Sequence, residues 1–287
     1  MAPFREIPIA DWANFVEFID KGLDAKELTP FIPSSYVFRG QAQSNWPLRH
    51  SLRRAGVGLP AVDLLRVEQL ASDAFHHHVY QHLDAATIQQ AAVDRVPWWI
   101  LMQHHGAPTR LLDWTASAYV AAYFAVVREP DTAGAVWAVH ARTTIEQVGN
   151  PPASREEVNQ LFLDSDPGGQ PPRLFVLRPT IETRRMAAQQ TIVTVSPNVI
   201  ADHGPILEGI PEPPGKALFL KFVIPAALKL EFLRKLRQLN ITAQVLFPGV
   251  DGLGRSVSEV VYLDAQNRAR LLGRAAGAVS PDDRERG

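Results

Sequence analysis

The chain has 287 residues, of which 46% are hydrophobic and 21% charged, with 29 Lys and Arg against 30 Asp and Glu. This composition is typical of a globular protein with a sizeable core, so it excludes global disorder. The near-zero net charge excludes an overall field that would gather nucleic acid or an anionic membrane. The absence of cysteine excludes disulfides, thiolate nucleophiles and cysteine-ligated zinc, and it fits a reducing compartment.

The first elements in chain order alternate between helices and strands. From Met1 onward, no basic segment is followed by an apolar run, so we expect no secretory signal. No apolar stretch approaches the roughly 18 residues of a membrane helix, and we expect a cytoplasmic protein without a membrane partner. Hydrophobic spacing predicts helices over 12–22, 62–83, 98–103 and 116–127, strands over 35–38 and 134–139, and a loop or short strand over 109–114.

The second half of the chain begins with a stretch rich in proline and glycine, residues 150–173, which predicts an insertion or linker loop. Beyond it we predict strands over 190–195 and 218–224, a helix starting at Pro225, and a short strand and turn over 244–249. We expect a single α+β domain over 1–265, a mixed β-sheet core with flanking helices, and a flexible tail over 266–287.

Arg39 follows a predicted buried strand, where its charge must reach water, a carboxylate or an anionic ligand. Asp113 is a candidate partner, because a guanidinium and a carboxylate pair through two parallel hydrogen bonds. Arg110 could make the same pair. The alternative to a ligand site is therefore an Arg39–Asp113 or Arg110–Asp113 ion pair that only pins two loops together.

Histidines suggest two further features. His104 precedes a backbone break at Gly106, where an imidazole could bind a phosphate or ribose, or exchange a proton near neutral pH. The alternative is a histidine that interacts with the helix dipole at a helix C-terminus. The cluster His76, His77, His78 and His82 contains a pair at metal-binding spacing but no third ligand, so we expect surface histidines and no metal site.

Other catalytic patterns are missing from the sequence. It has no Gly-x-Ser-x-Gly, no phosphate-binding Walker loop and no Gly-x-Gly-x-x-Gly after a strand, which argues against hydrolase and dinucleotide-binding folds of those types. Trp46 and Trp114 could stack on a planar ring, but aromatic residues in apolar surroundings are more often part of the core.

Two blocks of sequence resemble the FRG domain family, a bacterial and phage group named for its Phe-Arg-Gly motif. The first block runs from Phe38 through Arg39, Gly40 and Gln41 to Arg53, and the second, longer block covers 103–115 and 121–125. The resemblance spans roughly residues 20–200. The family's further Ala-Gln-x-Gly-x-Phe-Thr block is similar to residues 188–194, where Thr191 and Val193 replace the Gly and the Phe.

The order of these blocks also resembles the plan of ADP-ribosyltransferases, by an analogy at the level of the fold. The resemblance implies that Arg39, within Phe38 to Gln41, pairs with a pyrophosphate, and that Trp114 or Tyr123 stacks on nicotinamide. It also implies that His104 or Thr115 hydrogen-bonds the ribose, and that Gln189 lies where those enzymes carry a late Glu or Gln. Asp113 could supply the missing carboxylate.

These resemblances imply an enzyme that acts on NAD or a related nucleotide, an ADP-ribosyltransferase or NAD glycohydrolase serving as a toxin or phage-defence effector. NAD would be a substrate and not a resident cofactor, and the acceptor would be a protein or a nucleic acid. The alternative is a non-catalytic binding module in which Arg39, His104 and Arg110 recognise an anionic ligand or a partner protein. Both hypotheses predict that these residues and Asp113 meet in one pocket.

Overall fold

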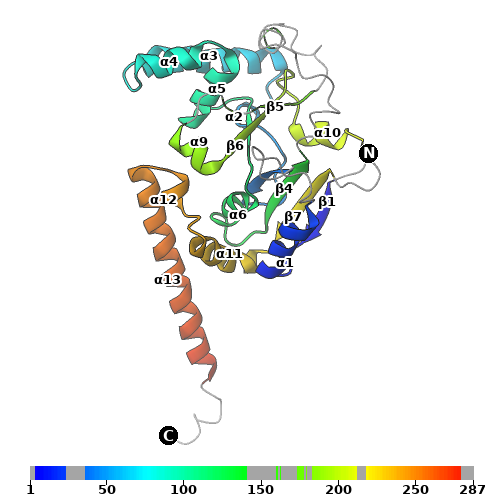
Figure 1. The fold of residues 1–287 in the computed structure, drawn as a ribbon, viewed down its shortest axis with the longest axis vertical. Coiled ribbons are helices and arrows are strands. Elements are labelled where there is room, and N and C mark those ends of the chain that lie inside the picture. The colour runs from blue at the N-terminus through cyan, green and yellow to red at the C-terminus, as the bar shows by residue number, and fades with distance from the viewer. Residues whose placement is uncertain are drawn as a thin grey trace, which may run out of the picture.

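A seven-stranded mixed β-sheet forms the centre of the molecule in this computed structural model (Figure 1). The structure describes residues 4–23, 36–140, 160, 162, 173–177, 179, 183–211 and 218–278. The strands are β1 Arg5–Pro8, β2 Tyr36–Gln41, β3 Leu112–Thr115, β4 Gly134–His140, β5 Phe175–Leu177, β6 Thr191–Val195 and β7 Phe219–Ile224. Their order across the sheet is β1-β7-β4-β2-β3-β6-β5, in which β1 and β7 are parallel and the other neighbours antiparallel. The predicted mixed sheet with flanking helices is therefore confirmed.

Helices cover the sheet and extend beyond it. In the first half of the chain they are α1 Trp12–Glu17, the π-helical η1 Phe18–Gly22, α2 Ser51–Ala55, α3 Ala61–Val79, α4 Ala85–Ala92, α5 Arg95–His104 and α6 Ala118–Val126. In the second half they are α9 Arg184–Gln189, α10 His203–Glu208, α11 Ala226–Gln238, α12 Ala243–Leu246 and α13 Val250–Ala278. Within the described parts of the chain, none of these helices is long and apolar enough to cross a membrane.

Both faces of the central strand β4 are buried, as its continuous apolar sequence predicts. Val136 and Ala138 join the core that packs the sheet against α1, α6 and α11. Ala135 and Trp137 join a second core on the opposite face, which includes Leu207 of α10. Because neighbouring residues of a strand point to opposite faces, one short apolar run anchors both layers.

Two regions near the C-terminus differ from the sequence-based expectation. Residues 243–246 form the helix α12 and not a strand, because the buried residues Ala243 and Leu246 lie three apart, on one face of a helical turn. Residues 266–278, which we assigned to a flexible tail, continue α13; Figure 1 shows this helix running away from the body of the molecule. The other tail residues and almost all of the predicted insertion over 150–173 lie outside the described residues.

Candidate functional site

The ladder between β2 and β3 is open along most of its length. β2 pairs with β4 through all six of its residues, but it pairs with β3 only at Phe38 and Thr115. If the antiparallel ladder continued, Arg39 would face Trp114 and Gly40 would face Asp113. The Phe-Arg-Gly segment of β2 and the Leu-Asp-Trp-Thr segment of β3 therefore diverge beyond this one pair. The gap between them, next to Arg39 and Asp113, contributes to a cavity.

Gly40 is required by the packing of α6 on β2. A Cβ atom at this position would lie 1.8 Å from the backbone oxygen of Ala121, far inside any real contact distance. Gly134 on β4 is under the same constraint, because its Cβ would lie 2.2 Å from the backbone oxygen of Ala125. The glycine of the motif thus lets the helix lie directly against the strand, which sets the position of the cavity wall.

A cavity of about 1070 Å³ opens at this place. It has ample room for a nucleotide, because small-molecule sites usually measure about 300–1,000 Å³. Nine of the eleven residues proposed for the site line it, namely Phe38, Arg39, Gly40, Gln41, Asp113, Trp114, Thr115, Tyr123 and Gln189. His104 and Arg110 are not among the lining residues. Of the four charged or titratable residues that we expected in one pocket, only Arg39 and Asp113 therefore meet there.

Arg39 remains a cation with unused hydrogen-bonding capacity. Its Nη1 donates to the backbone oxygen of Asp113 at 2.6 Å, while its buried Nε has no hydrogen-bond partner among the described residues. Burial lowers the pKa of Arg39 to about 10, against the opposing effect of Asp113, so the guanidinium stays protonated at neutral pH. The predicted pairing of Arg39 with the Asp113 carboxylate is replaced by a contact with its main chain.

The Asp113 carboxylate lies in the cavity and is held by an amide. Gln103 Nε2 donates to Asp113 Oδ1, and Gln103 Oε1 in turn accepts from the Thr109 hydroxyl. Burial by the surrounding protein raises the pKa of the Asp113 carboxyl, with Arg39, the Gln103 hydrogen bond, Arg185 and Arg54 opposing that rise. A carboxylate in such surroundings is suited to hydrogen-bonding a hydroxyl or stabilising a developing positive charge.

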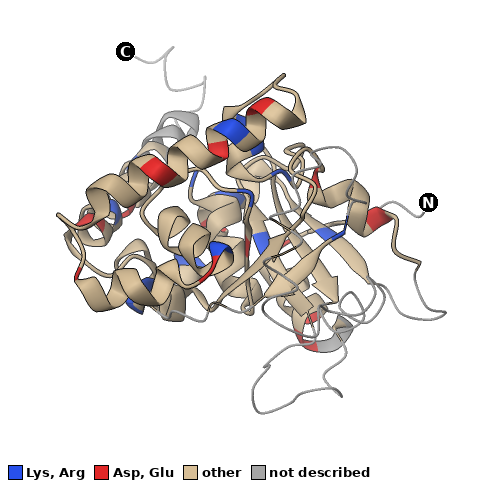
Figure 2. Cartoon of the chain, turned by 90° about the horizontal axis from the view of Figure 1, so that it is seen from above, with Lys and Arg blue, Asp and Glu red and all other residues tan. Residues whose placement is uncertain are grey.

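The cavity is strongly cationic although the chain as a whole has a formal net charge of -1. Its lining residues include two acids, Asp113 and Glu259, and six arginines, namely Arg39, Arg49, Arg54, Arg128, Arg185 and Arg255. Arg49 pairs with Asp202, whereas the other five form no ion pair within the described parts of the chain. Figure 2 shows that basic positions occur on strands inside the molecule as well as on its outer helices. This excess of unpaired guanidinium groups favours an anionic ligand.

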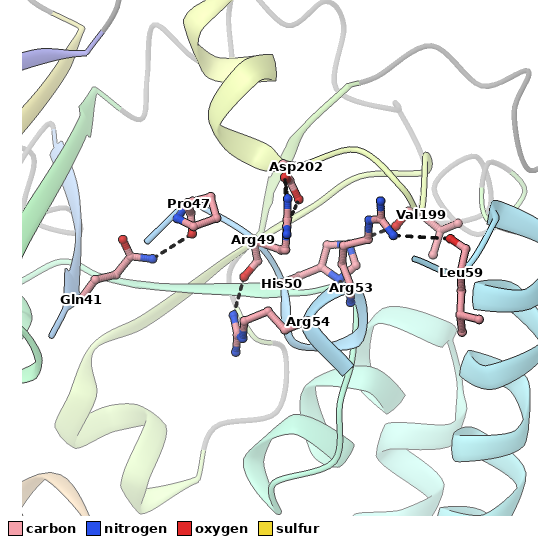
Figure 3. Close-up of polar contacts among 9 residues, drawn as sticks. All are labelled: Gln41, Pro47, Arg49, His50, Arg53, Arg54, Leu59, Val199 and Asp202. Carbon is pink, nitrogen blue, oxygen red and sulfur yellow. Dashed lines mark hydrogen bonds and ion pairs between the residues drawn. The ribbon is translucent and has the colours of Figure 1, made fainter. Parts of the chain in front are cut away.

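The segment after β2 is fixed by several polar contacts, which Figure 3 shows together. Gln41 Nε2 donates to the Pro47 oxygen at 3.1 Å, and Arg49 makes hydrogen bonds of 2.5–3.0 Å to Asp202. Arg54 Nη1 donates to the Arg49 oxygen. These contacts place the guanidinium of Arg54 at the cavity wall without neutralising its charge.

The aromatic residues proposed to stack on a ligand are mostly core residues. Trp114 is 3% exposed and its indole nitrogen donates to Thr194 Oγ1 at 2.9 Å, and Tyr123 is 2% exposed and donates to Glu259. Both line the cavity but are almost fully buried, which leaves little of either ring for a ligand to stack on. Trp46, which is 42% exposed and lines the same cavity, presents the accessible ring.

Arg110 has a structural role and not the predicted ligand-binding one. It is 1% exposed, and its guanidinium donates to both carboxylate oxygens of Glu68 and to the Pro197 oxygen. The same group lies 4.8 Å from the centre of the Trp99 ring. Its charge and most of its donors are therefore used inside the protein. The predicted Arg110–Asp113 pair is not formed, and Arg110 pairs with Glu68 in its place.

His104 also lies away from the cavity lining, so the structure does not support its predicted catalytic role. Burial, with His105 and Arg185 as smaller causes, lowers the pKa of His104 to about 4, which keeps the imidazole neutral at pH 7. Its backbone oxygen accepts from Arg185 Nη1 at 3.1 Å. The residue thus orients an arginine of the cavity through its main chain.

Three further predicted residues line the cavity with part of their polar groups engaged. Gln41 accepts from the Trp137 indole at 2.7 Å besides donating to Pro47. Thr115 Oγ1 accepts from the backbone nitrogen of Ser117, and Gln189 Nε2 donates to the Leu246 oxygen, which joins α9 to α12. We find no group of three or more potential metal ligands in the described ranges.

The sequence analysis missed three basic and aromatic residues that line the cavity, Arg185, Phe247 and Arg255. Arg185 and Arg255 lie 4.8 Å and 4.5 Å from the centre of the Phe247 ring, although the three residues come from different parts of the chain. None of them belongs to a motif, and no spacing in the sequence connects them. A search for cations in and next to the first block could have added Arg49, which lies inside it, and Arg54, which follows its last residue.

Comparison with known proteins assigns one part of the chain. Residues 34–133 match the family model described as the FRG domain, and they include β2, the Gly40 contact and the Asp113 segment. A search of curated proteins and a search of solved structures each found no match. The chain therefore contains an FRG domain, which supplies Arg39 and Asp113 to the cavity.

Proposed function

We propose that the cavity binds NAD or a related nucleotide and that the chain transfers or hydrolyses its ADP-ribosyl group. The observation that carries this proposal is the juxtaposition of a free cation, Arg39, with a carboxylate, Asp113, where β2 and β3 separate. A cation suits a pyrophosphate, and a carboxylate suits the positive charge that develops on the ribose. The order of the sequence blocks, which resembles ADP-ribosyltransferases, suggests the reaction class.

In this proposal Arg39 and Arg54 bind the pyrophosphate and Trp46 stacks on one of the rings. The bond between ribose C1′ and the nicotinamide nitrogen breaks, and its electron pair passes to the nicotinamide, which leaves neutral. The Asp113 carboxylate stabilises the cationic ribose carbon. This carbon then bonds to the oxygen of water, whose proton passes to solvent or to Asp113, or to a nucleophile of an acceptor.

The second candidate is a binding module that recognises an anionic ligand without turnover. It is favoured by the buried state of Tyr123 and Trp114 and by the partial engagement of Gln189, because few free polar groups remain to assist catalysis. In both functions Arg39 and Arg54 bind the anion. Service as a toxin or phage-defence effector is part of the same proposal.

Nicotinamide release from labelled NAD tests the enzyme. We expect the wild-type chain to release nicotinamide and Arg39→Ala to lose at least tenfold in activity. Arg66→Ala is the matched control, because Arg66 is exposed on α3 and does not line the cavity. In a second reaction the label is placed in the ADP-ribosyl part of NAD. Label that stays in free ADP-ribose indicates a glycohydrolase, and label on a protein or nucleic acid indicates a transferase.

The same proteins separate the two candidates. If the wild type binds NAD but releases no nicotinamide, and Arg39→Ala loses the binding, the module is the correct function. If NAD neither binds nor reacts, while circular dichroism shows a folded protein, both candidates are wrong for this nucleotide.

A further inference from the structure

The charge of the cavity exceeds what a simple dinucleotide requires. Setting Arg49 aside with its partner Asp202, the lining residues carry five positive charges against two negative ones, an excess of three. The pyrophosphate of NAD carries two negative charges, and its nicotinamide ring carries one positive charge. A ligand that matches this cavity therefore has more phosphate charge than NAD.

Part of the surplus positive charge lies on one wall of the cavity, formed around Phe247. Arg185 of α9 and Arg255 of α13 both place their guanidinium groups over the ring of Phe247, which follows α12. Arg185 is oriented by its 3.1 Å hydrogen bond to the His104 oxygen. Arg255 is exposed, and its guanidinium makes no hydrogen bond or ion pair to any described residue.

The acid on this wall, Glu259, is already engaged. Glu259, one turn along α13 from Arg255, is 8% exposed and accepts a hydrogen bond from the Tyr123 hydroxyl. Its other oxygen lies 3.9 Å from Arg237 Nη1. The charges of Arg185 and Arg255 repel each other, and Asp113, which is held by Gln103, offsets this repulsion only for Arg185. An anion between the two guanidinium groups would remove the repulsion.

We propose that the ligand carries a third phosphate group, separate from its pyrophosphate, which Arg185 and Arg255 bind beside the Phe247 ring. This inference rests on the proposed function, and it makes the substrate class a dinucleotide with an additional ribose phosphate. Arginine is suited to this task because its planar donors match two phosphate oxygens at once. Stacking on Phe247 restricts the side chains in advance, which reduces the entropy lost on binding.

The test compares NADP with NAD by isothermal titration calorimetry, because these two ligands differ by one phosphate. We expect the wild type to bind NADP about tenfold or more tightly than NAD, since a phosphate gains charge-assisted hydrogen bonds. Arg255→Gln and Arg185→Gln should each remove most of that preference while leaving NAD binding almost unchanged.

Arg128→Gln is the matched control, because Arg128 lines the same cavity and carries the same charge, but the guanidinium groups found over the Phe247 ring are those of Arg185 and Arg255. If Arg128→Gln lowers the preference as much as Arg255→Gln, a diffuse field and not a phosphate site causes it, and the proposal is wrong. Equal affinity of the wild type for both nucleotides would overturn the third phosphate and leave the proposed function intact. Failure of both nucleotides to bind would overturn both proposals.

Discussion

The guanidinium of Arg39 donates to the backbone oxygen of Asp113, while the carboxylate of Asp113 accepts from Gln103. The two opposite charges are therefore close without forming the bidentate pair that would neutralise them. Each keeps capacity for a ligand, and the cation and the carboxylate can act on different parts of one molecule.

Asp113→Asn separates the two roles of the cavity. The substitution removes a negative charge among Arg39, Arg54 and Arg185, so we expect the affinity for pyrophosphate to rise about fivefold, from about 1 kcal/mol of relieved repulsion. Turnover of NAD should fall about a hundredfold, because the developing positive charge loses its counter-ion. Calorimetry and nicotinamide release measure the two effects.

Asp73→Asn is the control for this substitution, because Asp73 lies on α3 and contacts the side chain of Gln69. This control should change neither the affinity for pyrophosphate nor the turnover of NAD. Weaker pyrophosphate binding in Asp113→Asn would contradict the view that Asp113 opposes anions in the free protein.

The Arg110–Glu68 pair is expected to stabilise the fold without affecting the ligand. Glu68→Gln leaves a buried guanidinium without its counter-ion and should lower the free energy of unfolding by about 3–5 kcal/mol in urea titration. The double variant Glu68→Leu with Arg110→Met should recover most of this loss, because both charges are removed together. If the double variant folds but no longer binds anions, Arg110 has a role in the site after all.

Acid should destabilise the protein through His50. Burial lowers the pKa of His50 to about 4, so the unfolded chain, with a pKa near 6.5, binds more protons between these two values. The free energy of unfolding should therefore fall as the pH falls from 6.5 to 4, by about 3 kcal/mol for this residue.

His50→Asn tests that contribution by denaturation at several pH values. His50 Nδ1 accepts from the Arg53 backbone nitrogen at the start of α2, and asparagine can accept the same bond. The slope of stability against pH between 6.5 and 4 should decrease in the variant. An unchanged slope would show that other groups, such as the buried His203, cause it.

Gly40→Ala should unfold or strongly destabilise the chain, by about 3 kcal/mol or more, because the new methyl group meets the Ala121 backbone. Gly254→Ala is the comparison, since a Cβ there meets nothing within 4 Å and lies on a helix. It should stabilise the protein by about 0.5–1 kcal/mol. Thermal unfolding of both proteins measures these effects, and a stable Gly40→Ala would show that α6 can shift away from β2.

The sequence predicted the sheet better than the site. Strands such as β4 and β7 are apolar runs whose burial follows from composition, so their ranges were close. α13 was missed because the residues it buries include Gly252, Ser256 and Glu259, which give no hydrophobic periodicity. Gly252 is small because a Cβ there would lie 1.8 Å from the Phe247 oxygen.

The two motifs identified where the site lies but not what each residue does. Within the second block Asp113 faces the cavity, whereas Arg110 faces Glu68 inside the protein, and both are equally polar in sequence. Only the fold distinguishes them, because it decides which of the two charges has an internal partner. Arg185 and Arg255 reach the cavity through tertiary packing and could not be found by spacing.

The helix α13 begins more than a hundred residues after the matched segment ends, yet Arg255 and Glu259 on it form part of the cavity. Of the seven strands, residues 34–133 contain only β2 and β3. An expression fragment cut to the boundaries of the family match would keep β2 and β3 but lose β4 and β6, the strands on either side of them, and it would also lose α13. Biochemical work on this protein should therefore keep the polypeptide through at least residue 278, or a negative binding result will reflect the truncation.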